Sequence, residues 1–161
     1  MKPNSMFFEF TRWMAAAAVV LLLVGMFGGN TVSNADPETV VSAVTARIDM
    51  TNMLEGDNQM VKRFYGLDPS EYEACSLYYP TTNMMAEELL VIKLKDLSQQ
   101  ETVRTAIENR IATQKTTFEG YGVEQFELLS THAVVEIRGN FVLFVVSDAS
   151  EAALSAFRDA L

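Results

Sequence analysis

The sequence contains one cysteine and one histidine among its 161 residues. Because Cys75 has no second cysteine to pair with, an intramolecular disulfide and a site built from several thiolates are excluded. Because His132 is the only histidine, the common zinc sites with several histidines are excluded as well. The sequence also lacks a glycine-rich phosphate loop, a nucleophile elbow and a paired-cysteine motif. We therefore expect no metal and no other cofactor, and we predict that the protein is not an enzyme.

Basic residues are scarce in most of the chain. The whole sequence has 12 Lys and Arg against 21 Asp and Glu, which gives a net charge of −9. Lys2, Glu9 and Arg12 are the only charged residues before Asp36, so residues 36–161 carry 20 acidic and 10 basic side chains. Such an acidic surface repels phosphate groups, and we expect no binding to nucleic acid.

Charged residues are absent from residues 13–29, which are mostly Ala, Val, Leu, Met and Phe. As a helix this run rises about 26 Å, which is close to the thickness of the hydrocarbon layer of a membrane. Lys2 and Arg12 precede the run, so the positive-inside rule places residues 1–12 in the cytoplasm and residues 36–161 outside. We therefore predict a transmembrane helix at 13–29 that tethers the protein to the cell membrane.

The same run has features of a secretory signal peptide. A short basic segment precedes an apolar stretch, and the small residues Ser33 and Ala35 stand just before Asp36. In this alternative the protein is secreted after cleavage near Ala35. The length of the apolar run and the aromatic residues before it favour the membrane anchor. Residues 30–35 are expected to form a linker between this run and the domain.

Local patterns predict a single domain over residues 36–161. Asp36-Pro37 is typical of a helix start, and Ser98 with Glu101 has the spacing of a capping box. Gly139-Asn140 between two apolar runs indicates a two-residue β-hairpin turn. Helices are expected at 36–48, 57–65, 98–118 and 148–161, with a single turn at 68–71, and strands at 72–79, 89–95, 131–138 and 141–146.

The order of these elements predicts an α+β fold. A β-β-α unit occurs twice, which gives a four-stranded antiparallel sheet in the order β-β-α-β-β-α. The helices are expected to pack on one face of this sheet. The apolar helix at the N-terminus precedes the domain.

The predicted hairpin has two faces of different character. Its turn fixes the register so that Arg138 lies opposite Phe141 and Ile137 lies opposite Val142. One face is apolar throughout and is expected to meet the helices. The other face mixes polar residues with apolar ones, and we predict it as a candidate binding surface made by His132, Arg138, Phe141, Leu143 and Val145. The alternative is that the N-terminal helices, through an apolar stripe that includes Val40 and Val44, cover this face.

Other polar residues give weaker indications. His132 and Glu136 share the second face, which allows the alternative hypothesis of a secreted hydrolase or small-molecule-binding domain. The pair Glu87-Glu88 fits no calcium loop, and we expect it on the solvated surface. Cys75 is expected to act as a small apolar residue in a strand.

Four short motifs resemble one bacterial family. They are Tyr65-Gly-Leu-Asp-Pro-Ser-Glu-Tyr72, Asn83 followed by Ala86-Glu87-Glu88, Gly139-Asn140-Phe141-Val142 and Val145-Val146-Ser147-Asp148. The family is the domain of unknown function numbered four-three-five-eight, an extracytoplasmic family found mainly in Gram-positive bacteria. The resemblance covers most of residues 36–161. It implies a small exported or membrane-tethered domain with no assigned activity, cofactor or catalytic residue. We therefore expect a non-enzymatic extracytoplasmic domain that binds a protein or an envelope component.

Overall fold

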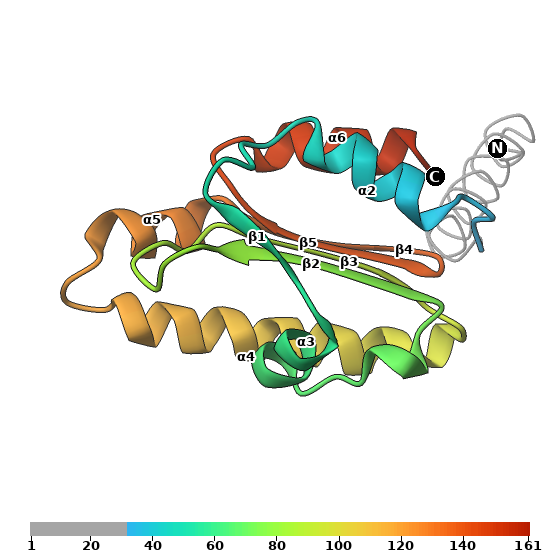
Figure 1. The fold of residues 1–161 in the computed structure, drawn as a ribbon, viewed down its shortest axis with the longest axis horizontal. Helices are drawn as coiled ribbons and strands as arrows, with labels where there is room; N and C mark the ends of the chain where they lie inside the picture. The colour runs from blue at the N-terminus through green and yellow to red at the C-terminus, as the bar shows by residue number, and fades with distance from the viewer. Residues whose placement is uncertain (1–31) are drawn as a thin grey trace, which may run out of the picture. The chain divides into compact units, whose positions relative to one another are not determined.

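Helices cover both faces of a five-stranded antiparallel sheet in the computed structural model, which describes residues 32–161 (Figure 1). The strands lie in the order β1-β2-β3-β5-β4. Their bounds are β1 Met53–Gly56, β2 Ala74–Pro80, β3 Glu88–Lys93, β4 Ala133–Arg138 and β5 Phe141–Val146. The helices are α2 Pro37–Thr45, α3 Asn58–Tyr65, α4 Gln100–Phe118, α5 Val123–Thr131 and α6 Ser150–Asp159, with short 3-10 turns at η1 Pro69–Glu71 and η2 Leu97–Gln99.

The predicted N-terminal apolar helix at 13–29 lies outside the described residues, as does the segment 1–12 before it. Residues 32–161 form one compact unit by themselves. In this part of the chain, none of the helices is both long and apolar enough to cross a membrane.

The predicted α+β class is confirmed, but the sheet of the described domain has five strands rather than four. The additional strand, β1, pairs with β2 so that Leu54 lies opposite Tyr79. The sequence of β1, Met-Leu-Glu-Gly, has no alternation of apolar and polar residues that would indicate a strand. In the structure, its residues Leu54 and Glu55 are both exposed. Pairing with a strand more than twenty residues away is what makes this segment extended.

Helix α5 and the capping box before α4 also differ from the prediction. Residues 123–130 are expected in the connection before a strand and Thr131 in the strand itself, but Val123–Thr131 forms helix α5. No side chain caps its first turn, so the usual sequence signal of a helix start is missing. Before α4, Asp96 and Gln99 form the capping box, in place of the one predicted for Ser98 and Glu101.

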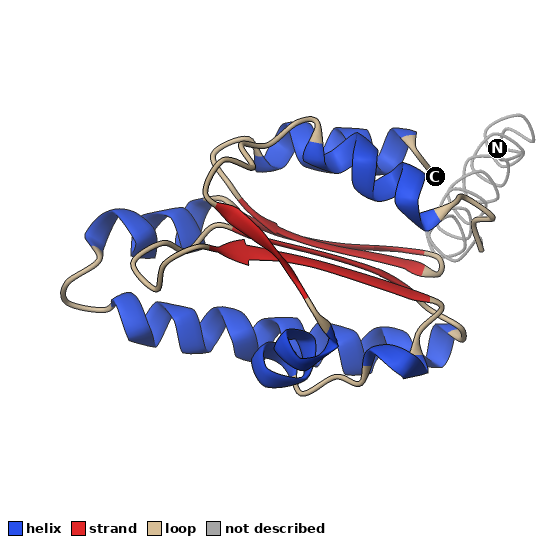
Figure 2. Cartoon of the chain, in the orientation of Figure 1, coloured by secondary structure: helices blue, strands red, loops and turns tan. Residues whose placement is uncertain are grey.

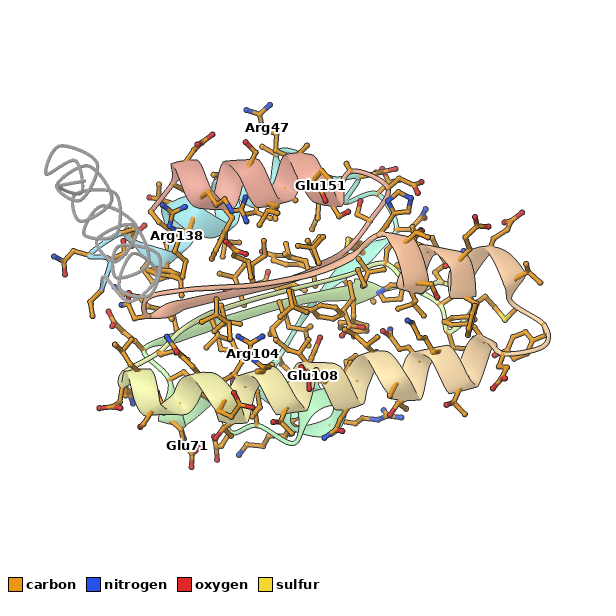
Figure 3. All side chains as sticks on the ribbon, turned by 180° about the vertical axis from the view of Figure 1, so that it is seen from behind. Arg47, Glu71, Arg104, Glu108, Arg138 and Glu151 are labelled. Carbon is orange, nitrogen blue, oxygen red and sulfur yellow. The ribbon has the colours of Figure 1, made fainter. Side chains whose placement is uncertain are left out.

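Helices lie on both faces of the sheet (Figure 2), and each face buries a separate core. On one face, β3 and β5 contribute Leu90, Ile92, Val142 and Phe144 to a core that α3, α4 and α5 close. On the other face, Leu89, Val91, Phe141, Leu143 and Val145 pack against α2 and α6. Side chains from both helical layers fill the space next to the sheet (Figure 3). The helices therefore lie on both faces, whereas the sequence analysis expected them on one.

The predicted hairpin register is confirmed, because Arg138 lies opposite Phe141 and Ile137 lies opposite Val142. The second face of this hairpin, however, is not an open surface. Phe141, Leu143 and Val145 are each 0 % exposed. They belong to the core under α2 and α6. The alternative, in which Val40 and Val44 cover this face, is therefore the arrangement observed.

The β4–β5 turn also forms hydrogen bonds with Ser33 at the start of the domain. Gly139 has a positive φ of 58° and Asn140 does not, which is the arrangement of a type II′ turn. The side chain of Asn140 is buried and binds the backbone of Ser33: Ser33 N donates to Asn140 Oδ1 at 2.7 Å, and Asn140 Nδ2 donates to Ser33 O at 3.1 Å. Ser33 Oγ donates to the carbonyl oxygen of Leu161 at 3.1 Å. Ser33, expected in the linker, is thus part of the folded domain.

Replacing Asn140 by alanine should lower the free energy of unfolding by about 1–2 kcal/mol, because both hydrogen bonds to Ser33 are lost. Urea unfolding of the full chain in a mild detergent measures this loss. In a chain that starts at Asp36 the same substitution should cost less, since Ser33 is no longer present. Asn58→Ala, at an exposed position, is the control. An equal loss in both chains would show that Asn140 acts within the hairpin alone.

Candidate functional site

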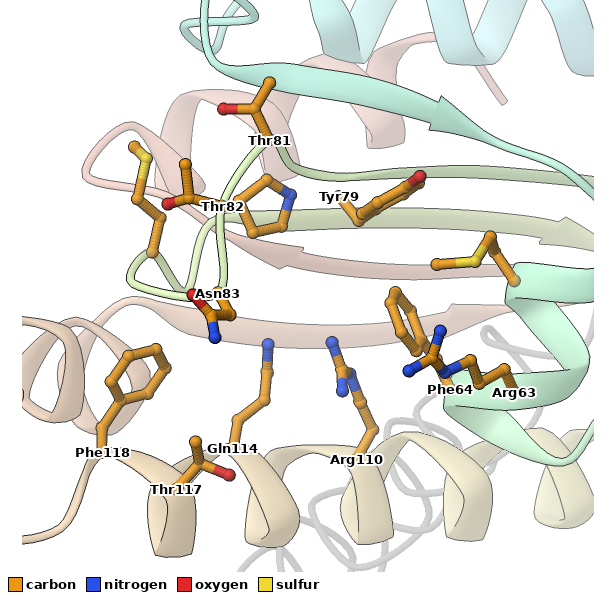
Figure 4. Close-up of a pocket in the computed structure, with 13 residues that line it drawn as sticks. Arg63, Phe64, Tyr79, Thr81, Thr82, Asn83, Arg110, Gln114, Thr117 and Phe118 are labelled. Atoms are coloured by element: carbon orange, nitrogen blue, oxygen red, sulfur yellow. The ribbon is translucent and has the colours of Figure 1, made fainter.

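A cleft of about 340 Å³ opens between α3, α4 and the connection from β2 to β3 (Figure 4). Its lining comes from three separate parts of the chain. These residues are Met60, Arg63 and Phe64 from α3, Arg110, Gln114, Thr117 and Phe118 from α4, and Tyr79, Pro80, Thr81, Thr82, Asn83 and Met85 from β2 and its connection to β3. In Figure 4 the side chains of Arg110 and Gln114 extend from α4 toward the strands.

The helical period explains why two polar residues of α4 face the sheet. At intervals of three or four residues, one side of α4 has Val103, Ile107, Arg110, Gln114 and Phe118. Residues with this spacing lie on the same side of a helix. The apolar members are buried in the core, and they place Arg110 and Gln114 against β3 as well.

Arg110 and Gln114 meet Glu88, which is fully buried at the start of β3. Arg110 Nε donates to the two carboxylate oxygens at 3.1 and 3.2 Å, and its Nη2 donates to Oε2 at 2.7 Å. Gln114 Nε2 donates to Oε2 at 2.9 Å, and the hydroxyl group of Tyr65 donates to Oε1. Three side chains therefore satisfy both oxygens of the buried carboxylate.

The surroundings of Tyr65 and Arg110 keep both side chains protonated, so both act as hydrogen-bond donors to Glu88. Burial raises the pKa of Tyr65 well above its usual value and the Glu88 carboxylate raises it further, so the hydroxyl group stays protonated and acts as a donor. Burial works against the charge of Arg110, but the hydrogen bonds and charge of Glu88 outweigh it and leave the pKa of Arg110 raised. Glu88 is thus a positioning residue that orients Arg110 and Gln114.

Aromatic rings hold Arg110 from its other side. Its guanidinium group lies 4.1 Å from the centre of the Phe64 ring, which is within the range of a cation–π contact. The Phe64 ring meets the ring of Tyr79 edge-on, at 5.5 Å between centres and 84° between planes. Arg110 is thus held by hydrogen bonds to Glu88 and by a cation–π contact with Phe64.

Gln114 Oε1 and the guanidinium group of Arg63, both in residues that line the cleft, have no partner within the described residues. Gln114 is 6 % exposed, and its Oε1 is buried without a hydrogen bond. Because the Glu88 carboxylate only accepts, Gln114 must turn its nitrogen toward Glu88, which leaves the oxygen as an unused acceptor. Arg63 is exposed and forms no ion pair in residues 32–161.

The charge of the lining is opposite to that of the chain. Two arginines and no Asp or Glu line the cleft. In the whole sequence, acidic residues outnumber basic ones by 21 to 12. The cleft is therefore a local basic region on an acidic protein.

The prediction that Glu88 lies on the solvated surface is wrong, because its side chain is 0 % exposed. A signal for its burial was present in the sequence. Glu88 is in phase with Leu90 and Ile92, and alternate residues of a strand face the same side. Arg110 and Gln114 were in phase with the apolar stripe of α4 in the same way.

The residues predicted from the hairpin lie elsewhere. His132 ends helix α5, where its backbone N–H donates to the carbonyl oxygen of Leu128 at 2.8 Å. The carboxylate of Glu136 accepts from Arg158 Nε at 2.9 Å, and Arg138 is exposed. None of the hairpin residues lines the cleft. Burial raises the pKa of Cys75 to about 12, so its thiol stays protonated at neutral pH.

A second cavity, of about 190 Å³, is lined in part by Asp49, Glu87 and Asp148. Despite these carboxylates, no group of three or more His, Cys, Asp or Glu in residues 32–161 is arranged to hold a metal ion. We assign no ligand to this cavity.

Comparison with curated proteins gave no match, and comparison with solved structures gave none either. The model of a family described as a domain of unknown function (DUF4358) matches residues 46–147. The match spans more than half of the chain and includes all residues that line the cleft, together with Tyr65 and Glu88 beneath it. The chain therefore belongs to the DUF4358 family, which confirms the resemblance of its short motifs.

Proposed function

We propose that this protein is a non-enzymatic, membrane-tethered extracytoplasmic domain that binds a protein or an envelope component in the cleft. The charge-free run at residues 13–29, with basic residues before it, supports the tether. The observation that carries the binding role is the cleft wall, in which the buried Glu88 binds both Arg110 and Gln114.

A role in binding explains this buried cluster better than a role in stability. Removing two charges from water can cost more free energy than their attraction restores, and apolar residues of similar size often stabilise a fold equally well. The Glu88–Arg110 pair does provide a fixed polar surface, because Phe64 holds the guanidinium group from the other side. Side chains that are ordered in advance lose little conformational freedom when a ligand binds.

The position of the cleft in the domain suits a tethered protein. Ser33, where the chain enters the domain, is bound to Asn140 in the β4–β5 turn. Strand β5 runs from this turn to Val146, which lies opposite Glu88 at the other end of the sheet. The β2–β3 connection that forms one wall of the cleft leaves the sheet at this far end (Figure 1). The cleft wall thus lies at the other end of the sheet from Ser33.

The contacts of Ser33 also favour the tether over secretion. Cleavage near Ala35 would remove the groups that bind Asn140 and Leu161. It would also remove the carbonyl oxygen of Ala35, which accepts from Lys93 Nζ at 3.2 Å. The alternative function, a secreted hydrolase or small-molecule site at His132 and Glu136, has no comparable support, because Glu136 is already engaged by Arg158.

Site-specific photocrosslinking in cells tests the binding role. A crosslinking amino acid at Thr117, which lines the cleft, should give an adduct that mass spectrometry can identify. The control is Thr116, which is also exposed and also donates to the carbonyl group one turn earlier, but does not line the cleft. The same adducts at both positions, or none at Thr117, would contradict binding in the cleft.

A further inference from the structure

We infer that two copies of this chain pair through the free edge of β4, so that their two sheets join into one antiparallel sheet. The inference goes beyond the proposed function, because none of the β4 residues lines the cleft. Two observations carry it: backbone groups at this edge that pair with nothing in residues 32–161, and charges on α6 that complement those of a second copy.

Strand β4 lies at an edge of the sheet, where β5 is its one neighbour among the described strands. Every residue of β4 is at least partly exposed, whereas all six residues of β5 are buried. Natural proteins protect such edges with a proline, a lysine, a bulge or an unmatched charge. β4 has no proline or lysine, its register with β5 is unbroken, and its central charge, Glu136, is matched by Arg158. The edge is therefore suited to pair with another strand.

The hydrogen bonds of β5 show which backbone groups of β4 are free. Leu94 N donates to Asn140 O at 2.7 Å, which continues the β3–β5 ladder and shows that the even-numbered residues of β5 face β3. Its odd-numbered residues then face β4, where their partners are even-numbered. The N–H and C=O groups of the odd-numbered residues of β4 therefore point away from β5, and no strand or loop backbone in residues 32–161 pairs with them. These residues are Ala133, Val135 and Ile137.

A second copy of β4 matches these free groups. A two-fold axis at Val135 sets two β4 strands antiparallel, with Ala133 of each copy opposite Ile137 of the other. Val135 then lies opposite its own counterpart, and all three pairs are of the hydrogen-bonded kind. Any other antiparallel register leaves some of these groups unpaired. The edge is thus complementary to itself, as the interface of a two-fold dimer must be.

The flank of α6 beside β4 has opposite charges at its two ends. Ala156 and Ala160 are on the side of α6 that faces α2. Glu151 and Arg158 are exposed on the other flank, where Arg158 Nε donates to Glu136 of β4 at 2.9 Å. The two-fold axis sets α6 of the two copies antiparallel, which places Glu151 of each copy beside Arg158 of the other. A strand of another protein would have no reason to present this pair of charges.

The helices of the two copies would also lie at a suitable distance. Helix α6 packs on both β4 and β5, so its axis runs over the space between these strands. With neighbouring strands about 4.8 Å apart, the two α6 helices would lie about 10 Å apart. This is an ordinary distance between packed helices, so the layer beside the joined sheet is continuous.

Disulfide trapping between two versions of the full chain tests the pairing. One version has Val134→Cys, the other has Glu136→Cys, and tags of different size distinguish them in membranes that contain both. In the inferred dimer these positions form a non-hydrogen-bonded pair with Cα atoms about 4.5 Å apart, which a disulfide can span. We expect the mixed disulfide to be the main crosslinked product after mild oxidation.

Two controls accompany the trapping. Val134→Cys combined with Arg138→Cys should give about fivefold less mixed disulfide, because these positions are diagonal and about 7–8 Å apart. The wild-type chain should give none, because burial raises the pKa of its Cys75 to about 12 and keeps the thiol protonated.

Substitutions test the groups that hold the dimer, with sedimentation of the full chain in detergent micelles as the measurement. Val135→Pro removes a free N–H and leaves the β4–β5 ladder intact, so it should abolish the dimer while circular dichroism shows a folded chain. Glu151→Lys places like charges beside Arg158 twice in the dimer and should weaken association about tenfold. Glu38→Lys is the matched control, because Glu38 is also exposed in the first turn of a helix, and it should leave association unchanged.

Three results would overturn the inference. The first is the absence of the mixed disulfide, or an equal amount from the control pair with Arg138→Cys. The second is an adduct of the Glu136→Cys version with a different protein in place of the mixed disulfide, which would show that another strand occupies the edge. The third is an equal effect of Glu151→Lys and Glu38→Lys on association.

Discussion

Replacing Arg110 by alanine should lower the free energy of unfolding by about 3–5 kcal/mol. The substitution leaves the carboxylate of Glu88, which is 0 % exposed, without its cation and without the donors of the guanidinium group. Only Tyr65 and Gln114 would still donate to it. An unmatched buried charge is among the most destabilising changes that a single substitution can cause.

Urea unfolding of the full chain measures this loss, and Arg104→Ala is the matched control on the same helix. Arg104 is exposed and lies 3.7 Å from Glu101, so its loss should cost less than about 0.5 kcal/mol. The double substitution Glu88→Gln with Arg110→Ala should cost less than Arg110→Ala alone, because no charge remains buried. A loss equal to that of Arg104→Ala would show that Glu88 is not a buried charge.

Replacing Phe141 by alanine should also lower the free energy of unfolding by about 3–5 kcal/mol, because the cavity it leaves adds to the lost burial of the ring. Phe141 is 0 % exposed, and its ring lies 6.5 Å from that of Phe157 in α6. The ammonium group of Lys93 lies 5.5 Å from the centre of the same ring, so a cation–π contact would be lost as well.

The decrease in the free energy of unfolding caused by Phe141→Ala tests whether Phe141 belongs to the core or to an open binding surface. Thermal or urea unfolding of the variant gives the value, and Val123→Ala is the control, since Val123 is 73 % exposed and should contribute less than about 0.5 kcal/mol. If Phe141→Ala unfolded like the wild-type chain, the second face of the hairpin would be open to solvent and would again be a candidate surface.

The α+β class and most elements could be predicted because their signals are local. The β4–β5 hairpin follows from Gly139-Asn140 between two runs of β-branched and aromatic residues, and its register was correct to the residue. Helix α2 follows from Asp36-Pro37, where Asp36 accepts from Thr39 N as a helix cap. Each of these signals involves residues within a few positions of one another, which the sequence displays directly.

The sequence by itself thus determined the fold class, the hairpin and the family. The tertiary structure decided which faces are covered, where β1 and α5 form, and where the candidate site lies. Glu88 was expected in solvent because its partners Tyr65, Arg110 and Gln114 are 22 to 26 residues away and come from two different helices. Burial and charge pairing depend on contacts between such distant segments, so they are fixed only when α3 and α4 pack on the sheet.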